Sequence, residues 1–279
     1  MMKKLLYLTL TIFLISSFVY FEKNLLWKKI QKKQFSIVPN GNVIFEGKTS
    51  SVQSFFISKT EVTNKQYRAF LNDLKTTNHL EDYQKFYPDT FAWNRTFKNE
   101  PSIKYTEYYF CHPAYYDYPV VNVSFEAAES YCKWYSEKIN KNLDEKDRLI
   151  FRLPTRKEFM RAARGDNYSQ VYAWAGDSIR NEKGNVLCNH ARIGPYYAES
   201  LSDGKSDIIA PSESYWPNDF GIFNLNGNVA EMISENERAV GGSWRNDAEN
   251  VKNESINLFS KPRPDVGFRI VATKLQKVK

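Results

Sequence analysis

The chain contains little cysteine and little histidine, with three of each in 279 residues. Three cysteines allow at most one disulfide bond and leave an odd thiol, so the chain is not a small disulfide-stapled domain. Charged residues make up 25% and apolar residues 42%, a composition that excludes an intrinsically disordered chain. Aromatic residues are abundant at 15%, which predicts a core or a binding surface rich in aromatic rings.

The folded part of the chain also lacks a basic excess. The formal charge is +7, but residues 1–33 contribute +6 from seven lysines and one glutamate, and the last seven residues contribute +3. Residues 34–272 therefore carry −2. A nucleic-acid-binding domain would carry its positive charge on the folded body, so we do not expect nucleic acid as a partner.

Residues 5–21 form an uncharged run of 17 residues behind a short basic start. This length lies between that of a signal-peptide apolar region, about 7–15 residues, and that of a membrane-spanning helix, about 17–25. No A-x-A-like cleavage site follows the run, and no lipidation cysteine is present because the first cysteine is Cys111. We interpret residues 1–34 as an uncleaved membrane anchor with a basic linker; a cleaved signal peptide and a buried helix are the alternatives.

The basic flanks of this run favour opposite orientations. Five lysines within residues 23–33 favour a cytoplasmic body under the positive-inside rule, whereas the short basic start favours export. We expect a membrane-anchored protein whose body, residues 35–279, lies in the periplasm or the cell envelope.

The body has few long periodic segments. Capping boxes that start at Thr63 and Thr155 predict helices over residues 63–74 and 155–165, and apolar spacing predicts a third helix over residues 124–139. Short strands are expected at residues 54–57, 120–123 and 268–272. Almost nothing is periodic between residues 166 and 261, so this part must be held by side-chain hydrogen bonds, buried aromatic rings or bound ions.

Six sequence blocks mark these segments. They are ISKTEVTNKQY from Ile57, PVVNVSF from Pro119, FRLPTRKEF from Phe151, NDFGIFNLNGNVAE from Asn218, GGSW from Gly241 and GFR from Gly267. Their order resembles that of the formylglycine-generating-enzyme, or sulfatase-modifying-factor, domain family over residues 38–273. The resemblance implies an α+β, C-type-lectin-like fold that is rich in loops and often holds calcium.

The middle of the chain carries a second resemblance. The segments YPDTFAW at residues 87–93, NEP at 99–101 and YYFCHPAY at 108–115 are similar to an insert of the gliding-motility lipoproteins GldK and GldJ of Bacteroidetes. This likeness implies a non-catalytic binding or assembly module, with envelope proteins or subunits of the gliding or type IX secretion machinery as partners. The chain departs from those proteins because it is short and lacks a lipidation cysteine.

The resemblance also specifies where a copper site would lie. The copper-dependent oxidases of the family hold the metal between two cysteines in the pattern G-G-S-x-x-C-x4-C, and this chain has Asn246 and Val251 at those positions. Neither side chain supplies the thiolate that Cu(I) requires, so we expect neither bound copper nor copper-dependent oxidation. An oxidase or oxygenase with a rearranged metal site, and a lectin-like ligand-binding protein, are the alternative functions.

Iron is also not expected. The iron-dependent members of the superfamily use an H-x3-H-x-E segment, which His79, His112 and His190 do not form. Lone carboxylates such as Glu61 and Glu158, and likewise Glu126, are interpreted as helix-start charges and caps.

Calcium is the cofactor that the resemblance favours, as a structural ion. The family loop N-x-x-G-x-V/A-x-E is filled by Asn224, Gly227, Val229 and Glu231. Ca²⁺ takes 6–8 oxygen ligands and accepts backbone carbonyls beside one or two carboxylates. The alternative is an Asn/Gly turn with a solvated Glu231.

A second calcium loop is suggested with less agreement in spacing. It would use Asn189, the carbonyl of His190 and Asp203.

The aromatic residues have two interpretations. Most are expected in the core, and some within residues 83–118 are expected to form a protein-binding surface.

Overall fold

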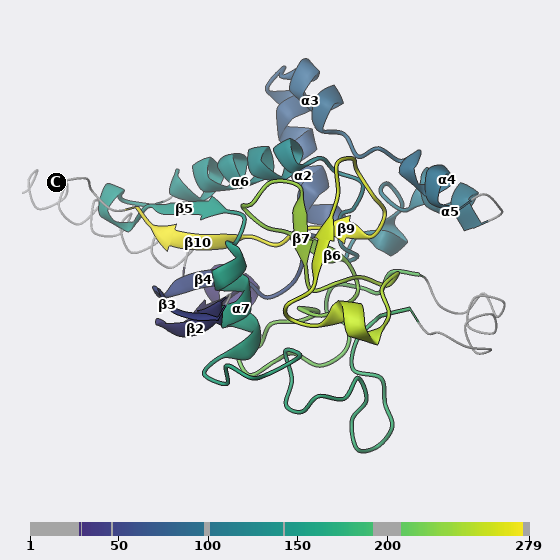
Figure 1. Ribbon diagram of the computed structural model, residues 1–279. Helices are drawn as coiled ribbons and strands as arrows, with labels where there is room; N and C mark the ends of the chain where they lie inside the picture. The colour runs from purple at the N-terminus through teal and green to yellow at the C-terminus, as the bar shows by residue number, and fades with distance from the viewer. Residues whose placement is uncertain are drawn as a thin grey trace, which may run out of the picture.

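The computed structural model describes residues 28, 30–45, 47–97, 101–141, 143–191 and 208–275. The predicted anchor, residues 5–21, lies outside these ranges. Within them, no helix has both the length and the apolar character needed to cross a bilayer. Helices and short strands alternate with long loops, which gives an α+β architecture (Figure 1).

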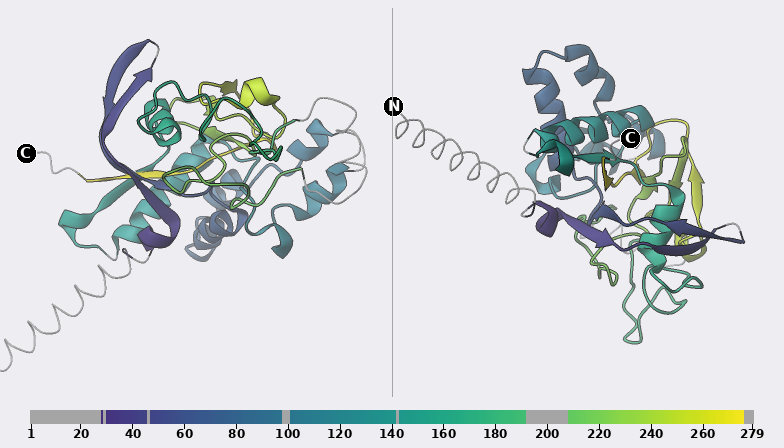
Figure 2. Two further views of the ribbon diagram at one scale, coloured as in Figure 1. Left: turned by 90° about the horizontal axis from the view of Figure 1, so that it is seen from below. Right: turned by 90° about the vertical axis from the view of Figure 1, so that its left-hand side faces the viewer.

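A four-stranded antiparallel sheet forms one half of the body. Its order is β1 (Phe35–Val38), β4 (Phe55–Ser58), β10 (Val271–Lys274) and β5 (Leu149–Arg152). The sheet brings the two ends of the described body together, because β10 pairs with both β4 and β5. Beside it, β2 (Gly41–Phe45) and β3 (Lys48–Val52) form a hairpin that extends from the body (Figure 2).

Three helices cover this sheet. Helices α2 (Asn64–Thr76) and α6 (Phe125–Asn140) lie on one side and α7 (Arg156–Arg164) on the other (Figure 1). Their starts confirm the sequence prediction: Thr63 and Thr155 form complete capping boxes, and Ser124 caps α6. Gly165, with a φ of +57°, ends α7.

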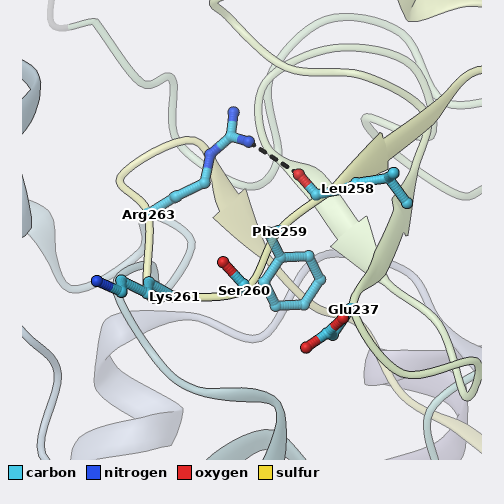
Figure 3. Close-up of a pocket in the computed structure, with 6 residues that line it drawn as sticks. All are labelled: Glu237, Leu258, Phe259, Ser260, Lys261 and Arg263. Atoms are coloured by element: carbon cyan, nitrogen blue, oxygen red, sulfur yellow. Dashed lines mark hydrogen bonds between the residues drawn. The ribbon is translucent and has the colours of Figure 1, made fainter.

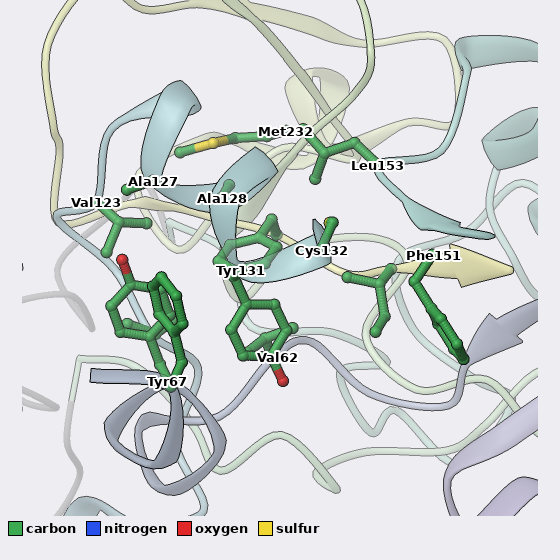
Figure 4. Packing of buried hydrophobic residues seen from close by; sticks show 14 of the residues in the cluster. Val62, Tyr67, Val123, Ala127, Ala128, Tyr131, Cys132, Phe151, Leu153 and Met232 are labelled. Carbon is green, nitrogen blue, oxygen red and sulfur yellow. The ribbon is translucent and has the colours of Figure 1, made fainter. Parts of the chain in front are cut away.

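The main core lies between α2, α6 and the sheet. Tyr67 and Tyr131 stack at 5.8 Å in its centre, and Cys132 packs beside them as its place on the apolar face of the helix predicted (Figure 4). Each buried aromatic side chain contributes several kcal/mol of transfer free energy, of the order of 2–3 kcal/mol, so these rings account for much of the stability of the fold.

A second sheet interrupts the irregular half of the chain. Its order is β8 (Ile256–Leu258), β7 (Arg238–Val240), β6 (Ala230–Met232) and β9 (Val266–Gly267). The strands have two or three residues each, too short for period-2 alternation to be visible in the sequence. Residues 166–229 otherwise follow the prediction of turns and bends without regular elements in the described part.

The insert between α2 and α6 is helical. It contains α3 (Leu80–Phe86), α4 (Ala92–Thr96) and α5 (Pro101–Tyr108), followed by a 3-10 turn at Pro113–Tyr115. Further 3-10 turns lie at Glu145–Asp147 and Ala248–Val251. The strand predicted at residues 120–123 is absent: this segment is buried and extended, but Asn122 has a φ of +62°, which breaks strand geometry.

Candidate functional site

A buried cluster of charged side chains lies where the two sheets meet. Glu231, on β6, accepts two hydrogen bonds of 2.5 Å from the guanidinium of Arg269, and both side chains are fully buried. Arg269 also donates to the carbonyls of Ser58 at 3.0 Å and Phe223 at 2.8 Å. One guanidinium therefore joins the end of β4, a loop and β6.

A second carboxylate lies in the same cluster. Glu61 is fully buried and accepts hydrogen bonds from the amides of Asn228 at 2.9 Å and Asn224 at 3.4 Å. Burial raises the pKa of Glu61 to about 8, although the charge of Arg269 opposes the shift. Both oxygens of Glu231 face the guanidinium, so Glu231 is the carboxylate that pairs directly with Arg269. The interpretation of Glu61 as a helix-start charge was wrong, whereas Glu158 does close the capping box of α7.

Buried asparagines hold the loops around this cluster. Asn226 accepts a hydrogen bond of 2.6 Å from the backbone of Ala173 and donates to the carbonyl of Val251 at 2.8 Å and to Asn253 at 3.0 Å. Such amides replace the ladder hydrogen bonds that an irregular chain cannot form. The sequence prediction that this half depends on side-chain hydrogen bonds is confirmed.

The first predicted calcium set lies on one loop. Asn224 and Gly227 both have positive φ, and a Cβ at Gly227 would lie 2.3 Å from the carbonyl oxygen of Asn189. Val229 and Glu231 follow on the way into β6. Glu231 is not solvated, because both of its oxygens face Arg269. The set fits calcium only in part, since an ion here would have to share Glu231 with a guanidinium.

The second predicted set is less complete. The amide of Asn189 donates to the carbonyl of Ile208 at 2.9 Å and to Asn228 at 3.2 Å, and its own carbonyl accepts from the backbone of Asn228. The His190 ring lies 3.2 Å from the carbonyl of Cys188. Asp203 lies outside the described residues. Within the described ranges, no three side chains of the types His, Cys, Asp and Glu gather at a metal-binding distance.

The family's copper positions are occupied by residues that fix the loop. The Asn246 side chain accepts hydrogen bonds from the backbone N–H of Ser243 at 2.9 Å and from its hydroxyl at 2.8 Å. Val251 is fully buried beside Tyr172 and Cys188. Asp265, also buried, pairs with Arg263 at 2.6 Å next to this loop. None of these groups supplies a thiolate pair.

The insert covers the tryptophan that follows the Gly-Gly-Ser turn. Phe97 stacks on Trp244 with 5.8 Å between ring centroids, and Trp93 stacks on Phe97 and on Tyr105. Trp93, Tyr105 and Trp244 are buried in one cluster. The expectation that most aromatic residues lie in the core is confirmed, while Phe91 is one of the rings that the insert leaves exposed.

Clefts in the described part of the chain adjoin these networks. A cleft of about 330 Å³ is lined by residues of the β8 edge and the following loop, where Arg263 donates to the carbonyl of Leu258 (Figure 3). A larger cleft of about 690 Å³ lies beside Lys33–Phe35 and the start of α2. No sequence motif predicted the larger cleft, because its lining residues are spread along the chain from Lys33 to Ile270.

Comparison with known proteins identifies the family. Residues 27–274 match the sulfatase-modifying factor enzyme 1-like domain. The chain belongs to this family. The family resemblance and its α+β fold are thereby confirmed.

The relatives of this chain include a formylglycine-generating enzyme and a protein that is named as an inactive one. The chain is 28% identical over 206 residues to a formylglycine-generating enzyme of Streptomyces coelicolor, covering 67% of this chain and 59% of that protein. It is 25% identical over 245 residues to the inactive C-alpha-formylglycine-generating enzyme 2 of Bos taurus, covering 76% and 72%. The chain thus spans about three fifths of the Streptomyces protein.

Solved structures agree in fold. CarF superimposes with a TM-score of 0.57 at 19% identity, covering 87% of this chain and 98% of that one. PvdO from Pseudomonas aeruginosa superimposes with a TM-score of 0.56 at 18% identity, covering 86% and 94%. At this identity the likeness concerns the fold alone.

Proposed function

We propose that this chain is a non-catalytic member of the sulfatase-modifying-factor family that acts as a binding or assembly module. The observation that carries the proposal is the pair Asn246 and Val251 at the positions of the copper-binding cysteines. Asn246 makes loop hydrogen bonds and Val251 packs in the core. Both side chains thus have structural roles that need no metal.

The insert supports the same proposal. Because Phe97 stacks on Trp244, the face next to the Gly-Gly-Ser turn is covered by aromatic rings. A substrate peptide approaching this turn would have to displace them. A relative that is named as inactive is consistent with a family member that has lost its chemistry.

The cellular role is the finer part of the proposal. Its support is the resemblance of the insert to the gliding-motility lipoproteins GldK and GldJ, together with the apolar run at residues 5–21. We place the body in the cell envelope on a membrane anchor, as a component associated with gliding motility or type IX secretion. Crosslinking and affinity capture from native membranes should recover envelope subunits of such a machine; repeated recovery of none would contradict this role.

A metal-binding experiment tests the absence of catalysis. The purified protein should not compete with a chromophoric chelator for Cu(I), because no thiolate pair lies at the loop. The variant Asn246→Cys/Val251→Cys provides the positive control, since it restores the family's cysteine spacing. Stoichiometric high-affinity Cu(I) in the wild-type protein, or oxygen consumption with a cysteine-containing peptide, would refute the proposal and favour an oxidase with a rearranged site.

Calcium stays part of the proposal as a structural ion. Its support is the loop that contains Asn224, Gly227 and Val229, because the positive φ angles of Asn224 and Gly227 turn the chain as a carbonyl-based site requires. The ion would stabilise the loop and would take no part in chemistry.

A further inference from the structure

The 690 Å³ cleft lies where the chain enters the folded body. Its walls come from separate parts of the fold: the segment that leads into β1, the end of β4, the start of α2, the middle of α6 and the loop at residues 211–213, together with Asp117 and Ile270. A volume of this size is in the range of protein ligand sites, about 300–1,000 Å³. The cleft is distant in sequence from the copper positions and takes no part in the networks that fix them.

The cleft has an apolar floor. Phe35, Val62, Tyr131 and Ile270 line it, and the main core leaves only 1–4% of each of these residues exposed. Tyr135 adds a half-buried ring whose hydroxyl donates to Gln34 at 3.0 Å. This floor suits an apolar side chain of a ligand.

Three lysines line its rim: Lys33, Lys59 and Lys65. Lys65 lies in the first turn of α2, where a cation opposes the positive end of the helix dipole, and this turn has no acidic residue. The first backbone N–H groups of α2 are already paired with Tyr118, Tyr116 and the Thr63 side chain. The positive charge available to a ligand therefore comes from lysine side chains.

Ser212 provides an independent sign of a ligand. Its side chain lines the cleft and is almost completely buried, with 1% of its surface exposed. Its backbone N–H donates to Asp117 and its carbonyl accepts from Asn224, but its hydroxyl has no hydrogen-bond partner among the described residues. A buried polar atom without a partner is uncommon in folded proteins and calls for one.

We infer that this cleft binds a peptide segment of a partner protein in which an acidic residue neighbours apolar residues. The acidic side chain pairs with the lysine rim, the apolar residues cover the aromatic floor, and the peptide backbone pairs with the Ser212 hydroxyl. Asp117 and Glu213, also on the rim, favour a peptide over an anionic lipid surface, because they can accept hydrogen bonds from backbone N–H groups. The inference names a partner class for the binding role proposed above and rests on that role.

A random heptapeptide display library, panned on the full-length protein in detergent, tests the inference. We expect enriched sequences that combine Asp or Glu with apolar residues, and synthetic copies of them should bind at least tenfold more weakly to Lys65→Glu. Lys183→Glu, which reverses an exposed lysine on a distant loop, should leave their affinity unchanged. Ser212→Ala should weaken binding severalfold without lowering the melting temperature, because the hydroxyl forms no bond in the free protein.

Three results would overturn the inference: no enriched sequence, enrichment of basic sequences, or affinity that Lys65→Glu leaves unchanged. Phosphatidylglycerol vesicles serve as the competing probe, and Lys65-dependent binding to them without peptide binding would assign the cleft to a lipid instead. Melting temperatures of Lys65→Glu, Lys183→Glu and Ser212→Ala check that each variant is folded. The Cu(I) assay tests the non-catalytic role independently of the cleft. If the protein binds neither copper nor peptide, the peptide-binding inference is rejected and the proposed non-catalytic role is not.

Discussion

The Glu231–Arg269 pair offers a quantitative test of how the loop-rich half is held together. Arg269→Met removes the guanidinium that faces Glu231 and leaves the carbonyls of Ser58 and Phe223 without their donor. Removing one partner of a buried ion pair costs about 3–5 kcal/mol, because the remaining charge is buried without compensation. Each orphaned carbonyl adds about 1–3 kcal/mol. Since a domain has about 5–15 kcal/mol of stability in total, the variant should lie close to unfolding.

Urea denaturation followed by tryptophan fluorescence at pH 7 in excess EGTA measures this loss. The double variant Arg269→Met/Glu231→Met removes both charges, so it should recover at least about 2 kcal/mol relative to Arg269→Met. Lys85→Met is the matched control: Lys85 and Glu126 form a 2.6 Å ion pair whose side chains are 55% and 60% exposed. Because such pairs contribute about 0–1 kcal/mol, this variant should be nearly neutral.

Two results would refute the reasoning. A loss below about 1 kcal/mol in Arg269→Met would show that the pair does not brace the loops. If the double variant loses as much free energy of unfolding as the single variants Arg269→Met and Glu231→Met together, the two side chains act independently.

Three further predictions concern the same region. Burial raises the pKa of Glu61 to about 8, above its unfolded value of 4.5. The contribution of Glu61 to stability is therefore fully present below pH 4.5 and is lost as the pH rises through 8. Glu61→Gln should flatten this loss and exceed the wild type in melting temperature at pH 9, and an equal dependence of melting temperature on pH in the two proteins would contradict the shift. Gly227→Ala should lower the free energy of unfolding, measured by urea denaturation, by at least about 2 kcal/mol, because its Cβ would lie 2.3 Å from the Asn189 carbonyl oxygen. Gly184→Ala is the control, since Gly184 has a similar φ and open space around it, and it should cost only about 1 kcal/mol. Similar costs for the two variants would count against a close approach at Gly227. Calcium should raise the melting temperature of the wild-type protein and not that of Glu231→Ala, and no shift in the wild type would reject the calcium proposal.

The sequence predicted best what depends on neighbouring residues. Capping boxes at Thr63 and Thr155 fixed two helix starts because both partners lie within three residues. Cys132 was placed in the core by helical periodicity alone. Three of the ordered blocks contain the helix caps Thr63, Ser124 and Thr155, which are local features of the sequence.

The candidate site was harder to predict because its contacts span the whole chain. Glu61 lies 208 positions before Arg269, and no local pattern connects them. Because a capping box begins two residues after Glu61, the sequence predicted Glu61 as a helix-start charge. That prediction was wrong. Glu231 was predicted as a calcium ligand and lies on β6, and its partner Arg269 was missed although it lies in the quoted Gly-Phe-Arg block. A buried ionised carboxylate is normally paired with a cation, and the quoted blocks contain Arg152, Arg156 and Arg269 as candidates for that partner.

The Gly-Gly-Ser loop is held by hydrogen bonds and packing among its own residues and their neighbours. Asn246 takes both hydrogen bonds that Ser243 offers, so the turn closes on itself without a metal–thiolate bond. Asp265 then ties the turn to Arg263, because the Ser243 hydroxyl lies 3.3 Å from the same carboxylate. Val251 replaces a reactive thiol by an apolar side chain that packs against Tyr172. Asn246 and Val251 therefore supply contacts that hold the loop at the two positions where the family resemblance implies cysteines.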